Sequence, residues 1–138
     1  MHDVSYQHQF DYLSDGGSSS FPGIRTRISL PADPANGIEV VAHLDSGAQQ
    51  SIFDGEISQV IGLDLMSGRP QVYQSTSRGQ VNAMLHNVRL SHPILGTFDL
   101  EVGLTTTRIY RNLLGRDFFN FFQVGFRERY RQFLLTPE

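Results

Sequence analysis

The stretch VVAHLDSGAQQSIF, residues 40–53, places an acid, a small hydroxyl residue and a glycine directly after an apolar run. Aspartate is a poor strand residue and is costly to bury, so Asp45 at the end of such a run needs a reason. An ordinary turn is one reason, because Asp, Ser and Gly all favour turn conformations. Residues 45–47 alone therefore indicate either a turn or a site, and a second segment is needed to decide.

That second segment is YRNLLGRDFF, residues 110–119, in which an apolar pair and a glycine precede Arg-Asp and an aromatic run. Together the two segments resemble the retropepsin-like aspartic proteases. Members of that family carry an apolar strand into Asp-Thr/Ser-Gly-Ala and, further along, an apolar-apolar-Gly-Arg-Asp/Asn signature before a short helix. Here Asp45 and Gly115 are 70 positions apart, and the resemblance covers residues 22–136.

The resemblance implies an aspartic endopeptidase that hydrolyses peptide bonds, with Asp45 as its catalytic residue. Two carboxylates held close together cannot both ionise, so they share one proton. The ionised carboxylate takes a proton from a water molecule, and the protonated one donates to the peptide carbonyl. The substrate is then a peptide or protein, and no cofactor is expected.

One chain supplies half of such a site. Asp15 lies among turn formers and Asp54 follows no apolar strand, so neither matches Asp45. A two-fold homodimer would supply Asp45 twice in equivalent settings. Residues 133–135, Phe-Leu-Leu, are expected to extend a sheet shared by the two copies.

Further residues are implied to support the catalytic loop without reacting: Ser46, Gly47, Ala48, Leu113, Leu114 and Gly115. Ser46 replaces the more usual threonine and would hydrogen-bond across the carboxylate pair. Gly47 would let the backbone turn beneath the partner, and Gly115 would allow two backbones to approach closely.

Two features depart from the family pattern. Arg116 usually pairs with an acid just after the catalytic loop, but the matching position here is Gln49. We therefore expect another partner for Arg116, either Asp117, as a loop ion pair, or Asp54. The second departure lies in the flap, the hairpin that closes over substrate.

The segment YQSTSRGQVNAM, residues 73–84, lies in the interval where the flap is expected. Its tip would be Ser77-Arg78-Gly79 between extended arms, and these residues would bind substrate. An ordinary hairpin would show the same pattern. An arginine at the tip is less apolar than the family pattern leads one to expect, which argues against the family's usual apolar substrates.

Alternation of apolar and polar residues predicts an all-β chain with strands at 23–30, 38–45, 71–77, 80–90 and 97–105. A terminal hairpin is expected over 123–137 with its turn at 127–129, and short helices at 54–63, capped by Asp54, and 116–122. The composition of PADPANG, residues 31–37, predicts the turn between the first two strands, and Asn36-Gly37 within it is a strong hairpin signal. The predicted fold is a closed acid-protease β-barrel, one lobe per chain, spanning residues 22–138 after a lead-in at 1–21.

Composition bounds the remaining possibilities. A chain of 138 residues with 39% hydrophobic and 18% charged residues suits one folded domain. The absence of cysteine excludes disulfides, thiolate zinc sites and a cysteine nucleophile. A net charge of −3 gives no reason to expect nucleic acid as a partner, and the sequence shows no secretory signal and no membrane span. We expect a soluble, cytoplasmic protein.

Other chemistries fit less well. His43 shares a strand face with Asp45, but the other histidines lack ligand spacing, so no metal is expected. Ser46 is not in a Gly-x-Ser-x-Gly elbow, and a glycosidase pair of Asp45 and Asp117 has no other support. The arginines within 127–131 suit a solvated hairpin tip better than a nucleic-acid surface. The main alternative is a retropepsin-like binding or dimerisation module without efficient catalysis.

Overall fold

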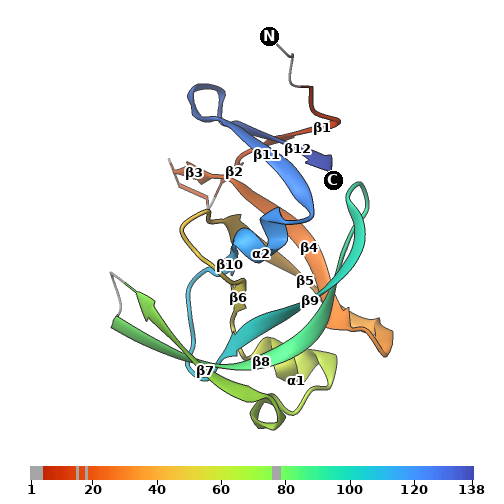
Figure 1. Cartoon of the computed structure of the whole chain (residues 1–138), viewed down its shortest axis with the longest axis vertical. Coiled ribbons are helices and arrows are strands. Elements are labelled where there is room, and N and C mark those ends of the chain that lie inside the picture. The colour runs from red at the N-terminus through yellow and green to blue at the C-terminus, as the bar shows by residue number, and fades with distance from the viewer. Residues whose placement is uncertain (1–4, 15, 18, 76–78) are drawn as a thin grey trace.

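The computed structural model describes residues 5–14, 16–17, 19–75 and 79–138, and most of these lie in strands (Figure 1). The strands are β1 (His8–Asp11), β2 (Leu13–Ser14), β3 (Ser20–Phe21), β4 (Gly23–Leu30), β5 (Asp33–Leu44), β6 (Ile52–Phe53), β7 (Arg69–Ser75), β8 (Gly79–His92), β9 (Gly96–Thr105), β10 (Asn112–Leu114), β11 (Phe122–Arg127) and β12 (Gln132–Pro137). The helices are α1 (Ile57–Ile61), α2 (Arg116–Phe119) and the 3₁₀ turns η1 (Leu65–Ser67) and η2 (Glu128–Tyr130). No helix in these described ranges is long and apolar enough to cross a membrane.

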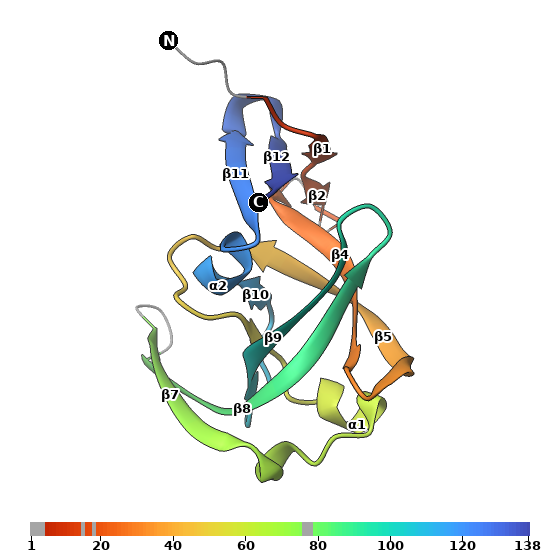
Figure 2. The same cartoon turned by 45° about the vertical axis from the view of Figure 1, so that its right-hand side comes forward.

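The main sheet closes into a ring, which confirms the all-β, closed fold expected from the alternation. Its strand order is β4-β5-β10-β6-β9-β8-β7, and an additional pairing of β4 with β8 joins the two sides. In that closing contact Ile28 lies opposite Leu90, and both are fully buried. β7 continues beyond the ring as the outer arm of a long hairpin with β8 (Figure 2).

Alternating residues of the ring strands form the core. In β4, Ile24 and Ile28 are buried, whereas Arg25 and Arg27 are exposed. Fully buried side chains from β8 and β9 face them: Val88, Leu90, Val102 and Leu104. Each such aliphatic side chain contributes roughly 1.5–3 kcal/mol of burial free energy, so the alternation sets the direction in which each strand faces.

The turn between β4 and β5 lies within the predicted turn segment, residues 31–37, but at its start. The chain reverses at Pro31-Ala32 instead of Asn36-Gly37, and Leu30 already pairs with Asp33. Residues 34–36 then form an irregularity within β5, where the register of the pair shifts. Proline presets the backbone angle that the first central turn position requires, which explains why the turn forms earlier.

A separate three-stranded sheet, in the order β1-β12-β11, carries both ends of the described chain (Figure 1). The predicted terminal hairpin is confirmed, with η2 at its turn. The expectation that residues 133–135 extend a sheet shared by two copies is wrong, because both edges of β12 are already paired within the chain. Phe133 and Leu135 are fully buried in the core of their own chain. β1 lies within the segment 1–21 that was expected to be a lead-in.

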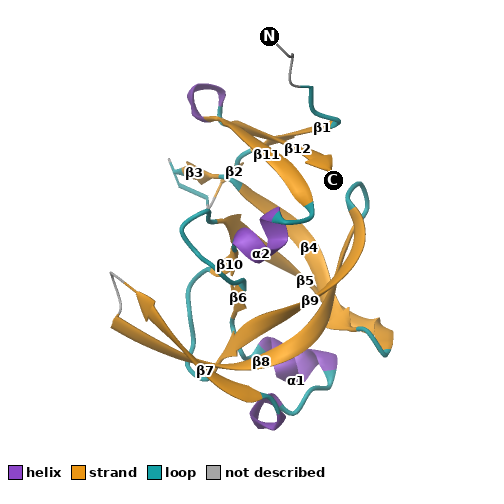
Figure 3. Cartoon of the chain, viewed as in Figure 1, coloured by secondary structure: helices purple, strands orange, loops and turns teal. Residues whose placement is uncertain are grey.

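Both short helices fall inside their predicted ranges. The carboxylate of Asp54 accepts the Glu56 N–H at 2.9 Å, so it closes the turn before α1 and does not occupy the N-cap position, which is Glu56. α2 is held by an aromatic cluster: the Phe118 ring is fully buried and lies 5.6 Å from Phe98 and 5.0 Å from Phe122. Figure 3 shows α2 directly after β10, beside the loop that follows β5.

Candidate active site

Asp45 follows the last residue of β5 and is anchored to a neighbouring strand. Its backbone N–H donates to the Leu114 carbonyl at 2.9 Å, and its carbonyl accepts the Ala48 N–H at 3.2 Å. Its carboxylate Oδ1 accepts the Gly47 N–H at 2.8 Å, which orients the side chain. The carboxylate is therefore positioned by its own loop in a half-buried place, and Ser46 beside it is exposed.

The second sequence segment lies directly against this loop. β10 runs parallel to β5, with Leu114 opposite Leu44 and Leu113 opposite His43, and on its other side Leu113 pairs with Ile52 of β6. Leu114 is fully buried in the core. The structure thus brings together two segments that lie far apart in the sequence.

At Gly115 the two backbones approach each other closely. A Cβ added there would lie 2.6 Å from the Ala48 carbonyl oxygen and 2.9 Å from the Gln50 carbonyl carbon, which is closer than real Cβ atoms come. The next N–H, that of Arg116, donates to the Ala48 carbonyl at 2.8 Å. Any side chain at position 115 would push the loop of residues 45–51 away from β10.

Ser51 and Asp117 connect the two segments through side chains, a link that the sequence analysis missed. The Asp117 carboxylate accepts the Ser51 N–H at 2.9 Å, the Ser51 hydroxyl at 2.7 Å and the Phe118 N–H at 2.8 Å. The same Ser51 hydroxyl oxygen accepts the Gly115 N–H at 3.0 Å. Ser51 is completely buried and Asp117 is half-buried, so these bonds are partly shielded from water. A serine six residues after the aspartate is the only signal that the sequence offers for this link.

The expected ion pair between Arg116 and Asp117 does not form. Within the described ranges the ion pairs are Arg69–Glu101 and Arg89–Asp99. The Asp117 carboxylate is occupied by Ser51 and by the first turn of α2, so it points into the loop and away from an exposed neighbour. The alternative partner, Asp54, instead accepts backbone N–H groups at residues 56 and 109.

Asp45 opens onto a cleft of about 920 Å³ between the loop of residues 45–51 and the β7–β8 hairpin. Gly47, Leu113, Gln50 and Tyr73 also line it. Among the described residues that line the cleft, Asp45 is the one carboxylate. A single chain therefore offers one acid where a shared-proton mechanism needs two.

Of the expected flap tip, Ser77 and Arg78 lie outside the described residues. Gly79 begins β8 with a φ of +70°, a left-handed conformation that glycine adopts without strain, and it pairs with Ser75. The two arms of the hairpin contribute Tyr73 and Val81 to the cleft wall. The hairpin therefore lies where a flap is expected.

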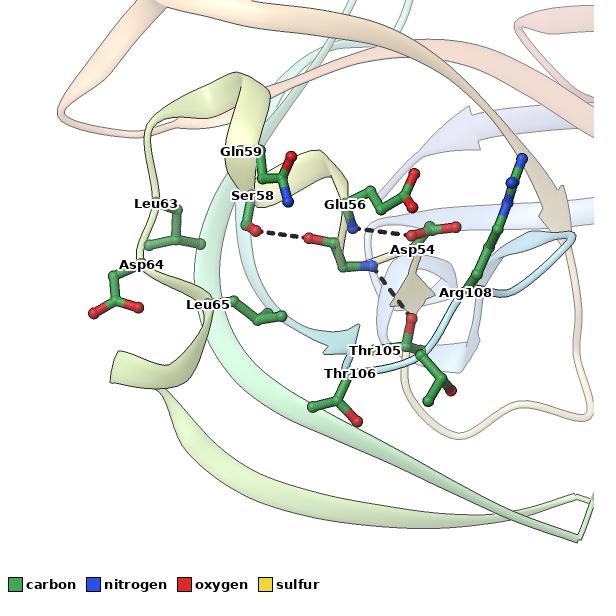
Figure 4. Close-up of a pocket in the computed structure, with 12 residues that line it drawn as sticks. Asp54, Glu56, Ser58, Gln59, Leu63, Asp64, Leu65, Thr105, Thr106 and Arg108 are labelled. Atoms are coloured by element: carbon green, nitrogen blue, oxygen red, sulfur yellow. Dashed lines mark hydrogen bonds between the residues drawn. The ribbon is translucent and has the colours of Figure 1, made fainter.

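A second, smaller cavity of about 320 Å³ lies between α1 and the end of β9 (Figure 4). Several of its polar groups bind each other: the Ser58 hydroxyl donates to the Gly55 carbonyl at 2.6 Å, and the Gly55 N–H donates to the Thr105 hydroxyl at 3.2 Å. Asp45 does not line it. Across the part of the chain that the structure describes, no group of three or more His, Asp or Glu side chains could hold a metal ion.

Comparison with solved structures gives the fold. The crystal structure of a retropepsin-like aspartic protease from Rickettsia conorii matches 98% of this chain and 96% of that one, with a TM-score of 0.65 at 17% sequence identity. The chain has the retropepsin-like fold. The structure of EIAV protease complexed with the inhibitor HBY-793 matches 78% of this chain and 92% of that one, with a TM-score of 0.51 at 18% identity. No protein-family model matches the sequence, and no curated protein matches it.

Proposed function

We propose that this protein is an aspartic endopeptidase whose active form is a homodimer with one Asp45 from each subunit. One observation carries the proposal: on a retropepsin-like fold, Asp45 stands at the end of β5 with its carboxylate held by the Gly47 N–H and facing the cleft. Two contacts support the loop that follows Asp45: the close approach of the Gly115 backbone to it and the hydrogen bond between Ser51 and Asp117.

In the proposed reaction the two Asp45 carboxylates share one proton. The ionised one removes a proton from a water molecule held between them, and the water oxygen attacks the peptide carbonyl carbon. The protonated one donates its proton to the carbonyl oxygen, so that a neutral tetrahedral diol forms. In the collapse of the diol, the Asp45 that took the proton of the water donates it to the leaving nitrogen, the other Asp45 removes a proton from one diol hydroxyl, and the C–N bond breaks. Ser46, exposed in the single chain, is proposed to hydrogen-bond across the two loops.

Peptide cleavage between pH 4 and 7 tests the proposal, using wild type and Asp45→Asn at equal concentration. Asparagine keeps the shape of the side chain but cannot take the proton of the water, so we expect cleavage to fall to the uncatalysed background while the fold is retained. A statine-type transition-state mimic should inhibit the wild type. Cleavage by the asparagine variant at close to the parent rate would contradict the aspartic mechanism.

The dimer has its own test. Specific activity should fall on dilution through the dissociation constant, and an excess of Asp45→Asn chains should inhibit wild type by forming mixed dimers. A chain that stays monomeric by sedimentation and keeps full specific activity at every dilution would refute the shared site. A dimer that binds peptide without cleaving it would favour the alternative, a binding module.

A further inference from the structure

Tyr73, in the β7 arm of the hairpin, contacts the active-site loop through its hydroxyl. The hydroxyl donates to the side-chain carbonyl of Gln50, and the amide nitrogen of Gln50 in turn donates to the Glu101 backbone carbonyl in β9 at 3.4 Å. Gln50 lies between Asp45 and β6, on the segment that also approaches Gly115. A chain of hydrogen bonds thus runs from the hairpin arm through the active-site loop to the ring.

The tyrosine ring fits into a recess that a glycine provides. A Cβ added at Gly103 would lie 2.6 Å from the Tyr73 hydroxyl oxygen and 3.0 Å from ring carbon Cε2. Gly103 lies in the interior of β9, where glycine costs stability and often marks a close approach of another group. The Gly103 N–H also donates to the Ser51 carbonyl at 3.0 Å, so the recess lies against the active-site loop.

The hydroxyl of Tyr73 keeps its proton over any pH at which the site is proposed to act. Burial, together with the nearby charges of Asp117 and Glu101, raises the pKa of Tyr73 to about 12. The hydroxyl is therefore a permanent donor, and Gln50 offers it a neutral acceptor. Both side chains line the same cleft as Asp45.

We infer that Tyr73 and Gln50 form a clamp that holds the β7–β8 hairpin against the active-site loop and so sets the width of the cleft beside Asp45. In the peptidase proposed above, on which this inference rests, the two are positioning residues for substrate. They do not touch the reacting atoms. The clamp explains three features together: a partly buried hydroxyl, a glycine inside a strand and a glutamine within the active-site loop.

A double-mutant cycle on the full chain tests the clamp. Tyr73→Phe keeps the ring above Gly103 and removes the donor, whereas Gln50→Leu removes the acceptor. A hydrogen bond of this kind changes an equilibrium about two- to tenfold. We expect amides of β7 to exchange hydrogen about two- to tenfold faster in each variant, KM for a peptide to rise by a similar factor, and kcat to change less than about twofold.

The double variant should be no worse than the more affected single variant, because either change breaks the same contact. Gln50→Glu keeps an acceptor for the hydroxyl and should restore slow exchange in β7. Tyr130→Phe is the matched control: Tyr130 is exposed in η2 and does not line the cleft, so loss of its hydroxyl should change neither exchange nor KM.

Unchanged β7 exchange in Tyr73→Phe, or fully additive effects in the double variant, would overturn the clamp. Its failure is distinguishable from failure of the proposed function. If the wild type cleaves peptides and the exchange effects are additive, the clamp is wrong and the peptidase stands. If the wild type cleaves nothing and the exchange effects are non-additive, the clamp stands and the peptidase is wrong.

Discussion

Replacing Asp117 with alanine should lower the free energy of unfolding more than replacing an exposed carboxylate would. The carboxylate accepts three hydrogen bonds of 2.7–2.9 Å, two of them from the fully buried Ser51. Bonds to a charged group contribute roughly 1.5–3 kcal/mol each, and part of that offsets the cost of desolvating the carboxylate. We expect Asp117→Ala to lower the free energy of unfolding by about 3–5 kcal/mol, since it also leaves buried donors of Ser51 without an acceptor.

Chemical denaturation at fixed protein concentration measures this loss, because dimerisation would otherwise shift the midpoint. The melting temperature should fall by about 10–17 °C for a domain of this size. Asp117→Asn should cost about 1–2 kcal/mol, because its amide can still accept one or two of the bonds but not all three.

Asp99→Ala is the control. Its exposed pair with Arg89, 2.8 Å between Oδ1 and Nε, should contribute little to stability, because solvent screens it. If Asp117→Ala cost no more than this control, the link between the two loops would not stabilise the site, and the reasoning would fail.

Three further predictions concern other parts of the molecule. Gly115→Val should lower the free energy of unfolding by several kcal/mol, roughly the cost of overpacking, because its side chain would meet the Ala48 carbonyl; an unchanged melting temperature would remove the proposed support role. The difference in absorbance at 295 nm between wild type and Tyr73→Phe should titrate near pH 12. The stability that the neutral Tyr73 hydroxyl contributes should be complete below about pH 10 and lost as the pH rises towards 12. A titration midpoint near pH 10 would contradict the partly buried environment of the hydroxyl. Burial and the nearby His8 lower the pKa of His92, whose Nδ1 accepts two backbone N–H groups. The stability that neutral His92 contributes should therefore be complete above about pH 6.5 and should decline as the pH falls below that value. His92→Asn keeps an acceptor that does not titrate, so the denaturation midpoint of this variant should fall less steeply with falling pH than that of the wild type. An equally steep fall in the variant would mean that another group causes the pH dependence.

The outline of the fold could be predicted because alternation is a local property. Buried Ile24 and Ile28 against exposed Arg25 and Arg27 already identify β4, and the same reasoning found the long strands and the terminal hairpin. The resemblance of residues 45–48 and 113–117 to known motifs indicated the fold that the structural comparisons then showed.

Tertiary structure decided which strand edges pair and which side chains form hydrogen bonds with each other. Nothing local in residues 133–135 reveals that β1 and β11 already occupy both edges of β12. The position of the β4–β5 turn depended on proline geometry and on a bulge that the sheet accommodates, and not on the stronger turn signal at Asn36-Gly37.

The same division holds at the site. The sequence alone determined that Asp45 ends an apolar strand and that a glycine follows a second apolar pair, because strand alternation and turn preference depend on neighbours along the chain. It did not determine that Asp117 would bind Ser51 instead of Arg116, or that Tyr73 would reach Gln50 above a glycine. Those contacts join residues 66 and 23 positions apart, and they exist only because ring closure brings β7, β9 and α2 around one loop.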